Sequence, residues 1–142
     1  MQHTVNLAAD EEQIRRCYPI LSQLRTHLDE SALVKQVIRQ QAQGFLLAYL
    51  ESEGEIRSVA GYRFSENLAY GKFMYVDDLV TNLADRSKGF GQILFDWLVA
   101  EGRRRRCDRL VLDSGVQRFG AHRFYLRKGM DIACHHFVMR LD

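Results

Sequence analysis

The sequence has little proline, few cysteines and no long apolar run. Pro19 is the only proline, and the three cysteines are scattered over 142 residues. No apolar run approaches the roughly 20 residues that span a membrane, and the N-terminus, Met1-Gln-His-Thr, lacks the basic and apolar regions of a secretory signal. These absences predict a cytoplasmic protein with reduced thiols, no disulfide framework and no membrane partner.

An excess of charge of one sign is also missing. Twenty basic residues face eighteen acidic ones, and the net charge of +2 is too small to predict nucleic acid as the main partner. The run Arg103–Arg106 falls at the end of an expected helix, where cations favour the helix dipole. An RNA-binding domain that uses this run is a distant alternative. The length and the 46% hydrophobic content predict one globular domain over residues 1–142.

A short glycine-containing loop between an apolar strand and an amphipathic helix is the most informative stretch. It reads Arg86-Ser87-Lys88-Gly89-Phe90-Gly91. Glycine lets the backbone approach a ligand closely because no Cβ stands in the way. The first N–H groups of a helix lack partners within the helix and carry partial positive charge. The loop is therefore predicted to bind a diphosphate, and Arg86 and Lys88 add charge beside it.

Three phosphate-binding patterns compete for this loop. A P-loop ends in Gly-Lys-Ser/Thr, whereas Gly89 is followed by Phe90-Gly91. A dinucleotide fingerprint needs a third glycine where this chain has Leu94. The pattern Arg/Gln-x-x-Gly-x-Gly/Ala matches at Arg86, Gly89 and Gly91. It resembles the acetyl-coenzyme A loop of the GNAT superfamily of N-acetyltransferases.

A second motif strengthens this resemblance. Residues 118–130 read Arg-Phe-Gly-Ala-His-Arg-Phe-Tyr-Leu-Arg-Lys-Gly-Met and follow an expected strand. They are similar to the closing motif of the family, a short helix that carries Ala-x-x-Phe-Tyr and ends at Gly-Phe/Met. The two motifs stand in the expected order and at the expected separation, and the resemblance covers essentially the whole chain.

The resemblance implies an enzyme that moves an acetyl group from acetyl-coenzyme A to a primary amine. We expect a small-molecule amine and direct transfer in a ternary complex. Two alternatives remain open: a module that binds acetyl-coenzyme A without turnover, and an acetyltransferase that acts on a protein amine. Members of the family often dimerise through the last strand, so a homodimer is also an open alternative.

The implied fold is a mixed α/β fold, with a central, mostly antiparallel sheet flanked by helices, and the local patterns agree with it. Asp10 is a plausible N-cap for a first helix, which Pro19 is expected to kink or divide. Glu53-Gly54 is expected to form a hairpin turn. The expected strands are residues 3–7, 45–50, 56–64, 72–81 and 109–113, the last of which is expected to be buried. A final extended segment covers 132–141. Three other helices are expected. The first covers 31–43, with Leu33, Val34, Val37 and Ile38 on one face. The second follows the glycine loop and buries Ile93, Leu94, Trp97 and Leu98, and the third covers 120–128.

The resemblance also implies which residues hold the coenzyme. The backbone of Leu79, Val80 and Thr81 would pair with the pantetheine arm like an added strand. Arg118 stands where the family often has asparagine, so the pantetheine contact at that position stays open. The diphosphate would be held by Arg86, Ser87, Lys88, Gly89, Phe90 and Gly91.

The catalytic residues are less clearly marked. Tyr125 stands where the family often keeps a tyrosine proposed to protonate the coenzyme A thiolate; the alternative is a tyrosine packed on the short helix. The glutamate of some members is replaced by Tyr75, so the base must be another residue. Asp78 is the first candidate and Asp77 the second, although in a regular strand they point to opposite faces. The alternatives for them are a strand-bulge contact and an ion pair. Asp113 is a third candidate.

The histidines and cysteines show no metal-binding spacing such as His-Glu-x-x-His or Cys-x-x-Cys, so no metal site is expected. His135 and His136 are expected in a late strand, where one of them would face the acceptor. The residues around Ala121–Gly129 are also similar to aminoalkylphosphonate N-acetyltransferases, which are reported to use a divalent metal. An aminophosphonate is therefore an alternative acceptor.

Overall fold

A five-stranded sheet organises the larger part of the chain. The computed structural model describes residues 2–142, which form two compact units that divide between Val111 and Leu112. The strands are neighbours in chain order, and the first four pair antiparallel. This confirms the expected mixed α/β fold with a mostly antiparallel sheet. The strands are β1 (Thr4–Leu7), β2 (Leu46–Ser52), β3 (Glu55–Asn67), β4 (Gly71–Thr81) and β5 (Arg109–Leu112).

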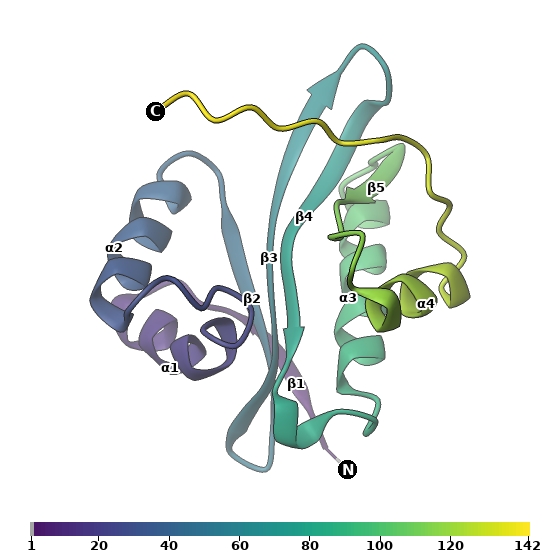
Figure 1. The fold of residues 1–142 in the computed structure, drawn as a ribbon. Coiled ribbons are helices and arrows are strands. Elements are labelled where there is room, and N and C mark those ends of the chain that lie inside the picture. The colour runs from purple at the N-terminus through teal and green to yellow at the C-terminus, as the bar shows by residue number, and fades with distance from the viewer. Residues whose placement is uncertain (1) are drawn as a thin grey trace. The chain divides into compact units, whose positions relative to one another are not determined.

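Helices cover both faces of the sheet in the first unit. Helices α1 (Glu11–Leu21) and α2 (Glu30–Gln41) lie on one face and α3 (Phe90–Arg104) on the other (Figure 1). Asp10 begins α1 as expected: its side chain accepts from the Gln13 N–H at 2.8 Å, and the Gln13 side chain accepts from the Asp10 N–H at 3.2 Å. This capping box satisfies N–H groups that lack partners within the helix.

Pro19 was expected to kink or divide the first helix, and the structure shows that it does not divide it. Helix α1 runs through Pro19 and ends two residues later, at Leu21. A proline so close to the end costs one helical hydrogen bond. The burial of Ile20 and Leu21 beyond it holds the last turn against the core.

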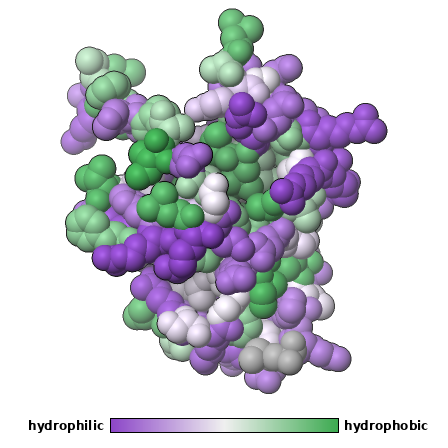
Figure 2. Space-filling view, turned by 90° about the vertical axis from the view of Figure 1, so that its right-hand side faces the viewer, coloured by the Kyte–Doolittle hydropathy of each residue, from purple (hydrophilic) through white to green (hydrophobic). Residues whose placement is uncertain are grey.

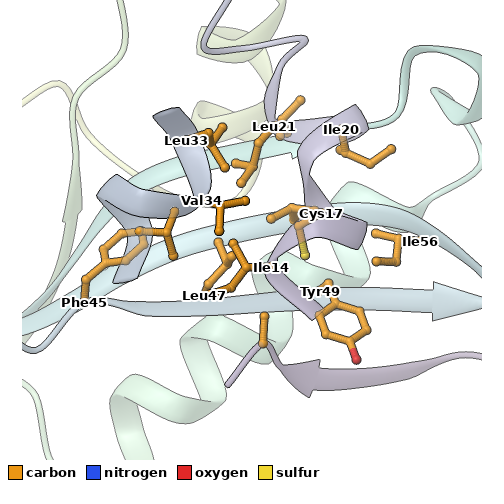
Figure 3. Close-up of a cluster of buried hydrophobic side chains, with 14 residues drawn as sticks. Ile14, Cys17, Ile20, Leu21, Leu33, Val34, Phe45, Leu47, Tyr49 and Ile56 are labelled. Carbon is orange, nitrogen blue, oxygen red and sulfur yellow. The ribbon is translucent and has the colours of Figure 1, made fainter. Parts of the chain in front are cut away.

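The main core lies between α1, α2 and the sheet. Figure 3 shows side chains from both helices and from the strands pointing toward one another there. Burial raises the pKa of the Cys17 thiol to about 12, so this cysteine is an inert apolar group of the core. The buried members are Ala8, Ile14, Cys17, Ile20, Leu21, Leu33, Val34, Val37, Phe45, Leu47, Tyr49, Ile56, Val59 and Val80.

The buried stripe of α2 is narrower than expected. Leu33, Val34 and Val37 are buried, but Ile38 is 45% exposed. At 3.6 residues per turn, Ile38 lies roughly 90° around the helix from the centre of that stripe. Gly44, three residues after the end of the helix at Gln41, has φ +101°, a left-handed conformation that glycine adopts readily.

The turn between β2 and β3 confirms the expected hairpin. Glu53 has φ 55° and Gly54 has φ 77°. Positive φ at both residues of a two-residue loop is the signature of a type I′ turn, whose twist matches that of the paired strands. The turn aligns β3 with β2, and β3 in turn pairs with β4 over most of its length.

The second unit contains one helix, α4 (Phe119–Arg127), which confirms the expected short helix. Residues 130–142 form no helix or strand in the described structure, and residues 131–142 are exposed, so the expected late strand with His135 and His136 was wrong. A strand needs a hydrogen-bonded neighbour, which apolar residues in sequence do not supply. In keeping with this exposure, hydrophobic side chains reach the surface among hydrophilic ones in Figure 2. The exposed apolar side chains of this segment include Ile132, Phe137, Val138, Met139 and Leu141.

One other expectation needs correction. The strand at residues 109–113 was expected to be buried, but β5 is exposed or half-buried because it is the last strand of the sheet. Within residues 2–142, no helix combines the length and hydropathy that a membrane crossing requires.

Helix α3 provides a direct test of the packing. Leu94 is fully buried, whereas its neighbour Ile93, expected on the same face, is half-buried. We expect Leu94→Ala to lower the free energy of unfolding by about 2–5 kcal/mol, because it removes buried methyl groups and leaves a cavity. The matched control, Ile93→Ala, should lower the free energy of unfolding clearly less. Urea unfolding checks both, and equal losses would contradict this assignment of the helix face.

Candidate active site

The glycine loop forms an open helix N-terminus beside the end of β4. A short 3-10 turn, η1 (Leu83–Asp85), leads into it, and α3 begins after Gly89. Gly89 has φ +87°, which glycine adopts without strain. Gly91 is needed for another reason: a Cβ there would lie 2.9 Å from Thr81 Oγ1. The two glycines thus set the turn and let the helix approach β4 closely.

The start of α3 is suited to an anion. Its N-cap, Gly89, provides no side-chain hydrogen bond to the first turn. No acidic residue lies in that turn. The first N–H groups of a helix are therefore directed at a ligand, with the positive end of the helix dipole behind them. Arg86, Ser87 and Lys88 are exposed along the loop. The residues present fit a diphosphate.

A buried carboxylate, Asp85, stabilises the glycine loop through hydrogen bonds. It accepts from Asn82 at 2.9 Å, from Arg57 at 3.1 Å and from Lys88 at 3.2 Å. The hydrogen bond from Asn82 is the main reason that the pKa of Asp85 is lowered, and Lys88 and Arg57 lower it further. Lys88 is thus held by Asp85 in this structure, and Arg57 also lies over the Phe90 ring. No sequence motif marks Asp85, because its three polar partners come together only in the fold.

Asp85→Asn tests this support. We expect it to lower the free energy of unfolding by about 1.5–3 kcal/mol, the range for hydrogen bonds to a charged group. The lowered pKa means that the contribution is present above 3.8, the ordinary value, and is lost as pH falls through the folded-state pKa. Unfolding curves at decreasing pH should show that the difference in free energy of unfolding between the variant and the wild type becomes smaller.

The matched control for that experiment is Glu55→Gln. Glu55 pairs with the same Arg57 at 3.2 Å but is 72% exposed. An exposed pair contributes about 0–1 kcal/mol, so this variant should stay near the wild type. Similar losses in both variants would show that burial of Asp85 gives the loop no special support.

The coenzyme-facing residues expected on β4 lie at its end. Leu79, Val80 and Thr81 pair with β3 on one side. On the other side β5 is only four residues long, and the residue before it, Asp108, donates its N–H to the Lys72 carbonyl at the start of β4. At about 3.3 Å per residue, β5 is too short to reach Leu79–Thr81. That edge is available for an extended arm to pair as an added strand.

A β-bulge places the two candidate carboxylates on β4. Gly61 pairs with Asp78, but the next residue, Tyr62, pairs with Val76, so Asp77 is the extra residue. The regular alternation of faces assumed for Asp77 and Asp78 therefore fails, because a bulge re-aims the side chains around it. Both residues line the same pocket.

Each carboxylate has its own arginine partner. Arg63 donates two hydrogen bonds to Asp77, at 2.8 and 2.9 Å. Arg25 donates to Asp78 Oδ1 at 2.7 Å and to the Asp77 carbonyl at 2.8 Å. Burial raises the pKa of Asp78 above its ordinary 3.8, although the hydrogen bond and the charge of Arg25 oppose this. Asp78 is thus the more shielded carboxylate and the one with the raised proton affinity.

Gly61 makes room for this arrangement. A Cβ at that position would lie 2.4 Å from the Phe45 ring and 2.7 Å from Asp78 Oδ2. Any larger residue would push these side chains apart. Neither Gly61 nor Arg25 was singled out from the sequence, because their roles depend on a bulge and on a contact 53 residues apart.

A pocket of about 280 Å³ lies between α2 and β4, which we call the α2–β4 pocket. One side is the helix α2 with the loop before it, and the other is formed by β2 and β4. Half of the lining residues are apolar, and all of these except Leu28 belong to the core described above. The pocket is lined by Leu21, Arg25, His27, Leu28, Leu33, Gln36, Val37, Gln40, Phe45, Leu47, Asp77 and Asp78.

The remaining candidates lie in the second unit. Tyr125 is on α4, its ring edge against Phe124 at 5.6 Å between centroids, and burial raises its pKa above the ordinary 10.0. Arg118 is the N-cap residue of α4 but gives no side-chain cap hydrogen bond. Asp113 lies 3.4 Å from His136 Nδ1. The hydroxyl of Ser114 is buried and has no hydrogen-bond partner in the described part of the chain, which a bound ligand could supply.

The described residues form no metal cluster, and the arginine run is partly paired. Among residues 2–142, no cluster of three or more histidine, cysteine or acidic side chains could hold a metal ion. In the arginine run, Arg104 pairs with Glu101 at 2.8 Å and Arg105 lies over the Phe64 ring at 4.1 Å. Two of the four arginines thus already have partners within the protein.

An antiparallel sheet, a glycine-lined helix start and an open edge at the end of β4 together define an acyl-coenzyme A-dependent acyltransferase fold. A family model described as the acetyltransferase (GNAT) family matches residues 9–130. The chain therefore belongs to the GNAT family of acetyltransferases.

Individual proteins support this membership. The chain is 36% identical over 129 residues, 90% of each chain, to an uncharacterized N-acetyltransferase, YhdJ, of Bacillus subtilis (strain 168). The protein is thus an acetyl-CoA-dependent N-acetyltransferase.

Solved structures share the fold at low sequence identity. A ribosomal-protein-alanine N-acetyltransferase from Brucella melitensis biovar Abortus 2308 superposes with a TM-score of 0.84 at 14% identity, covering 99% of this chain and 100% of that one. AAC(6')-Iy, in complex with the bisubstrate analogue CoA-S-monomethyl-acetylneamine, has a TM-score of 0.83 at 11% identity, covering 100% of this chain and 99% of that one.

Proposed function

We propose that the protein transfers an acetyl group from acetyl-CoA directly to the primary amine of a small molecule, in a ternary complex. One observation carries the proposal: on strand β4, the open edge beside the glycine loop directly follows the residues that line the α2–β4 pocket. The last residues of β4, Leu79–Thr81, adjoin the glycine loop, and the residues just before them, Asp77 and Asp78, line the α2–β4 pocket. A donor and an acceptor bound at adjoining positions of one strand are held for direct transfer.

The donor half of the proposal uses the open edge of β4 and the start of α3. The pantetheine arm pairs with the backbone of Leu79, Val80 and Thr81, and the diphosphate binds residues 86–91. Lys88 must leave Asp85, 3.2 Å away, to contact the diphosphate directly. Arg118 is proposed as a further contact to the coenzyme.

The chemistry needs two proton transfers. The amine nitrogen attacks the thioester carbonyl carbon, a nitrogen–carbon bond forms, and the carbon–sulfur bond breaks. Asp78 takes the proton that the amine loses, directly or through a water, with Asp77 as the second candidate. Tyr125 gives its proton to the departing coenzyme A thiolate, and its raised pKa keeps the phenol protonated at neutral pH.

Asp78→Asn tests the base. We expect kcat to fall by about 10²–10⁴-fold, the usual contribution of a general base. In the wild type kcat/KM should fall as pH drops through the raised pKa of Asp78, because only the carboxylate accepts a proton, and this limb should vanish in the variant. Asp77→Asn is the comparison, since Asp77 is held by Arg63. A larger loss in Asp77→Asn would reverse the assignment.

The Asp78→Asn protein is expected to stay folded. A carboxyl with a raised folded-state pKa binds its proton more tightly in the folded than in the unfolded protein. Its contribution to stability therefore falls as pH rises from 3.8 through the folded-state pKa. Replacing it by a neutral amide removes this cost at neutral pH, so lost activity would not reflect unfolding.

Tyr125→Phe tests the acid. We expect kcat to fall by about 10²-fold, the lower end for a general acid, because water can partly replace the phenol. The KM for acetyl-CoA should hardly change, since the ring and its packing on Phe124 remain. An unchanged kcat would assign Tyr125 to helix packing alone.

The alternatives differ in their acceptor. One structural neighbour is named for a ribosomal-protein alanine and another carries an analogue containing neamine, so the fold is found with both acceptor classes. The small volume of the α2–β4 pocket supports a small molecule here. Coenzyme A release with a panel of amines and N-terminal peptides tests this. Tight acetyl-CoA binding without turnover of any amine would favour the regulatory module instead.

A further inference from the structure

We propose that the acceptor is a monoamine with an apolar body, an alkylamine or arylalkylamine, which the α2–β4 pocket selects over polyamines and phosphonate-bearing amines. The inference rests on the proposed acetyl transfer at this pocket. It depends on which groups in the pocket walls can contact the part of the ligand other than its amine.

The inner wall of the pocket is apolar. Leu33 and Val37 line it from α2, Phe45 lines it from the position just before β2, and each is less than 8% exposed. Leu21, Leu28 and Leu47 extend the same surface. The volume of about 280 Å³ lies just below the ~300–1,000 Å³ of pockets for drug-sized ligands. A compact apolar body fits, and its burial drives binding.

The polar groups of the pocket are already largely paired with one another. Gln36 donates to Gln40 at 2.9 Å. Arg25 is bonded to Asp78 Oδ1 and to the Asp77 carbonyl, and the Asp77 carboxylate is bonded to Arg63. The Arg25 hydrogen bond uses one oxygen of Asp78, and Oδ2, on the side of Gly61, is the oxygen that remains for an amine. The pocket thus offers one carboxylate oxygen at its β4 end.

These lining groups favour some classes of amine over others. A polyamine would place its second ammonium against Leu33, Val37 and Phe45, where a buried charge lacks a partner. A phosphonate needs cations, and among the described lining residues only Arg25 and His27 are basic. Arg25 already donates its Nε to Asp78 and one Nη to the Asp77 carbonyl, which leaves only part of one guanidinium for a phosphonate. A monoamine with a hydrocarbon body has neither a second charge to bury nor a phosphonate that needs cations.

A homologous series of amines tests the apolar wall. With acetyl-CoA, kcat/KM should rise from ethylamine to pentylamine by about fourfold per methylene, as expected from burying one CH₂. Pentylamine and phenethylamine should exceed spermidine and 2-aminoethylphosphonate. Higher kcat/KM for spermidine or 2-aminoethylphosphonate would overturn this inference while leaving acetyl transfer intact. No coenzyme A release from any amine would instead overturn the proposed function itself.

Variants of α2 place the selection in this pocket. Val37→Phe fills the pocket and should lower kcat/KM for pentylamine at least tenfold through KM, while the KM for acetyl-CoA is unchanged. Val37→Ala enlarges it and should shift the preference toward longer amines. Ile38→Phe is the matched control, because Ile38 follows directly on the helix, is 45% exposed and does not line the pocket. Identical amine profiles for the wild type and both Val37 variants would overturn the assignment.

Discussion

The pairing of β3 with β4, interrupted by one bulge, is the constraint on which the site depends. Ten residue pairs hold the two strands in register, and the extra residue, Asp77, shifts the pairing once. Before the bulge β4 is an ordinary sheet strand; after it Asp78 faces Gly61 and the pocket, and Leu79–Thr81 reach the glycine loop. Because side chains alternate along a strand, a register without this shift would turn one set of functional groups to the wrong face.

Hydrogen bonds from charged and polar side chains then hold the carboxylates of the glycine loop and of the pocket in place. Asp85, buried below the loop, accepts hydrogen bonds from Asn82, Arg57 and Lys88, and Asp78 is held by Arg25 from the loop between α1 and α2. A buried charge is costly unless it is paired. These pairs connect distant parts of the chain, so the loop and the pocket depend on the packing of α1 and α2 against the sheet.

Much of the fold could be predicted from the sequence because its signals are local. The cap at Asp10, the turn at Glu53-Gly54 and the glycine loop depend on neighbouring residues, and the structure confirms the elements they predict. Predictions failed where distant neighbours decide. Ile38 is exposed because the sheet meets only part of α2, and residues 132–141 form no strand because strand formation requires a partner.

The sequence by itself determined the family and the donor. The spacing of Arg86, Gly89 and Gly91 implied acetyl-CoA, because the φ angles and close approach that glycine permits are properties of single positions. Only the tertiary structure decided what surrounds the α2–β4 pocket. The pairing of Arg25 with Asp78, the bulge at Asp77 and the apolar wall around Val37 join segments up to 53 residues apart, and contacts of that range arise from packing.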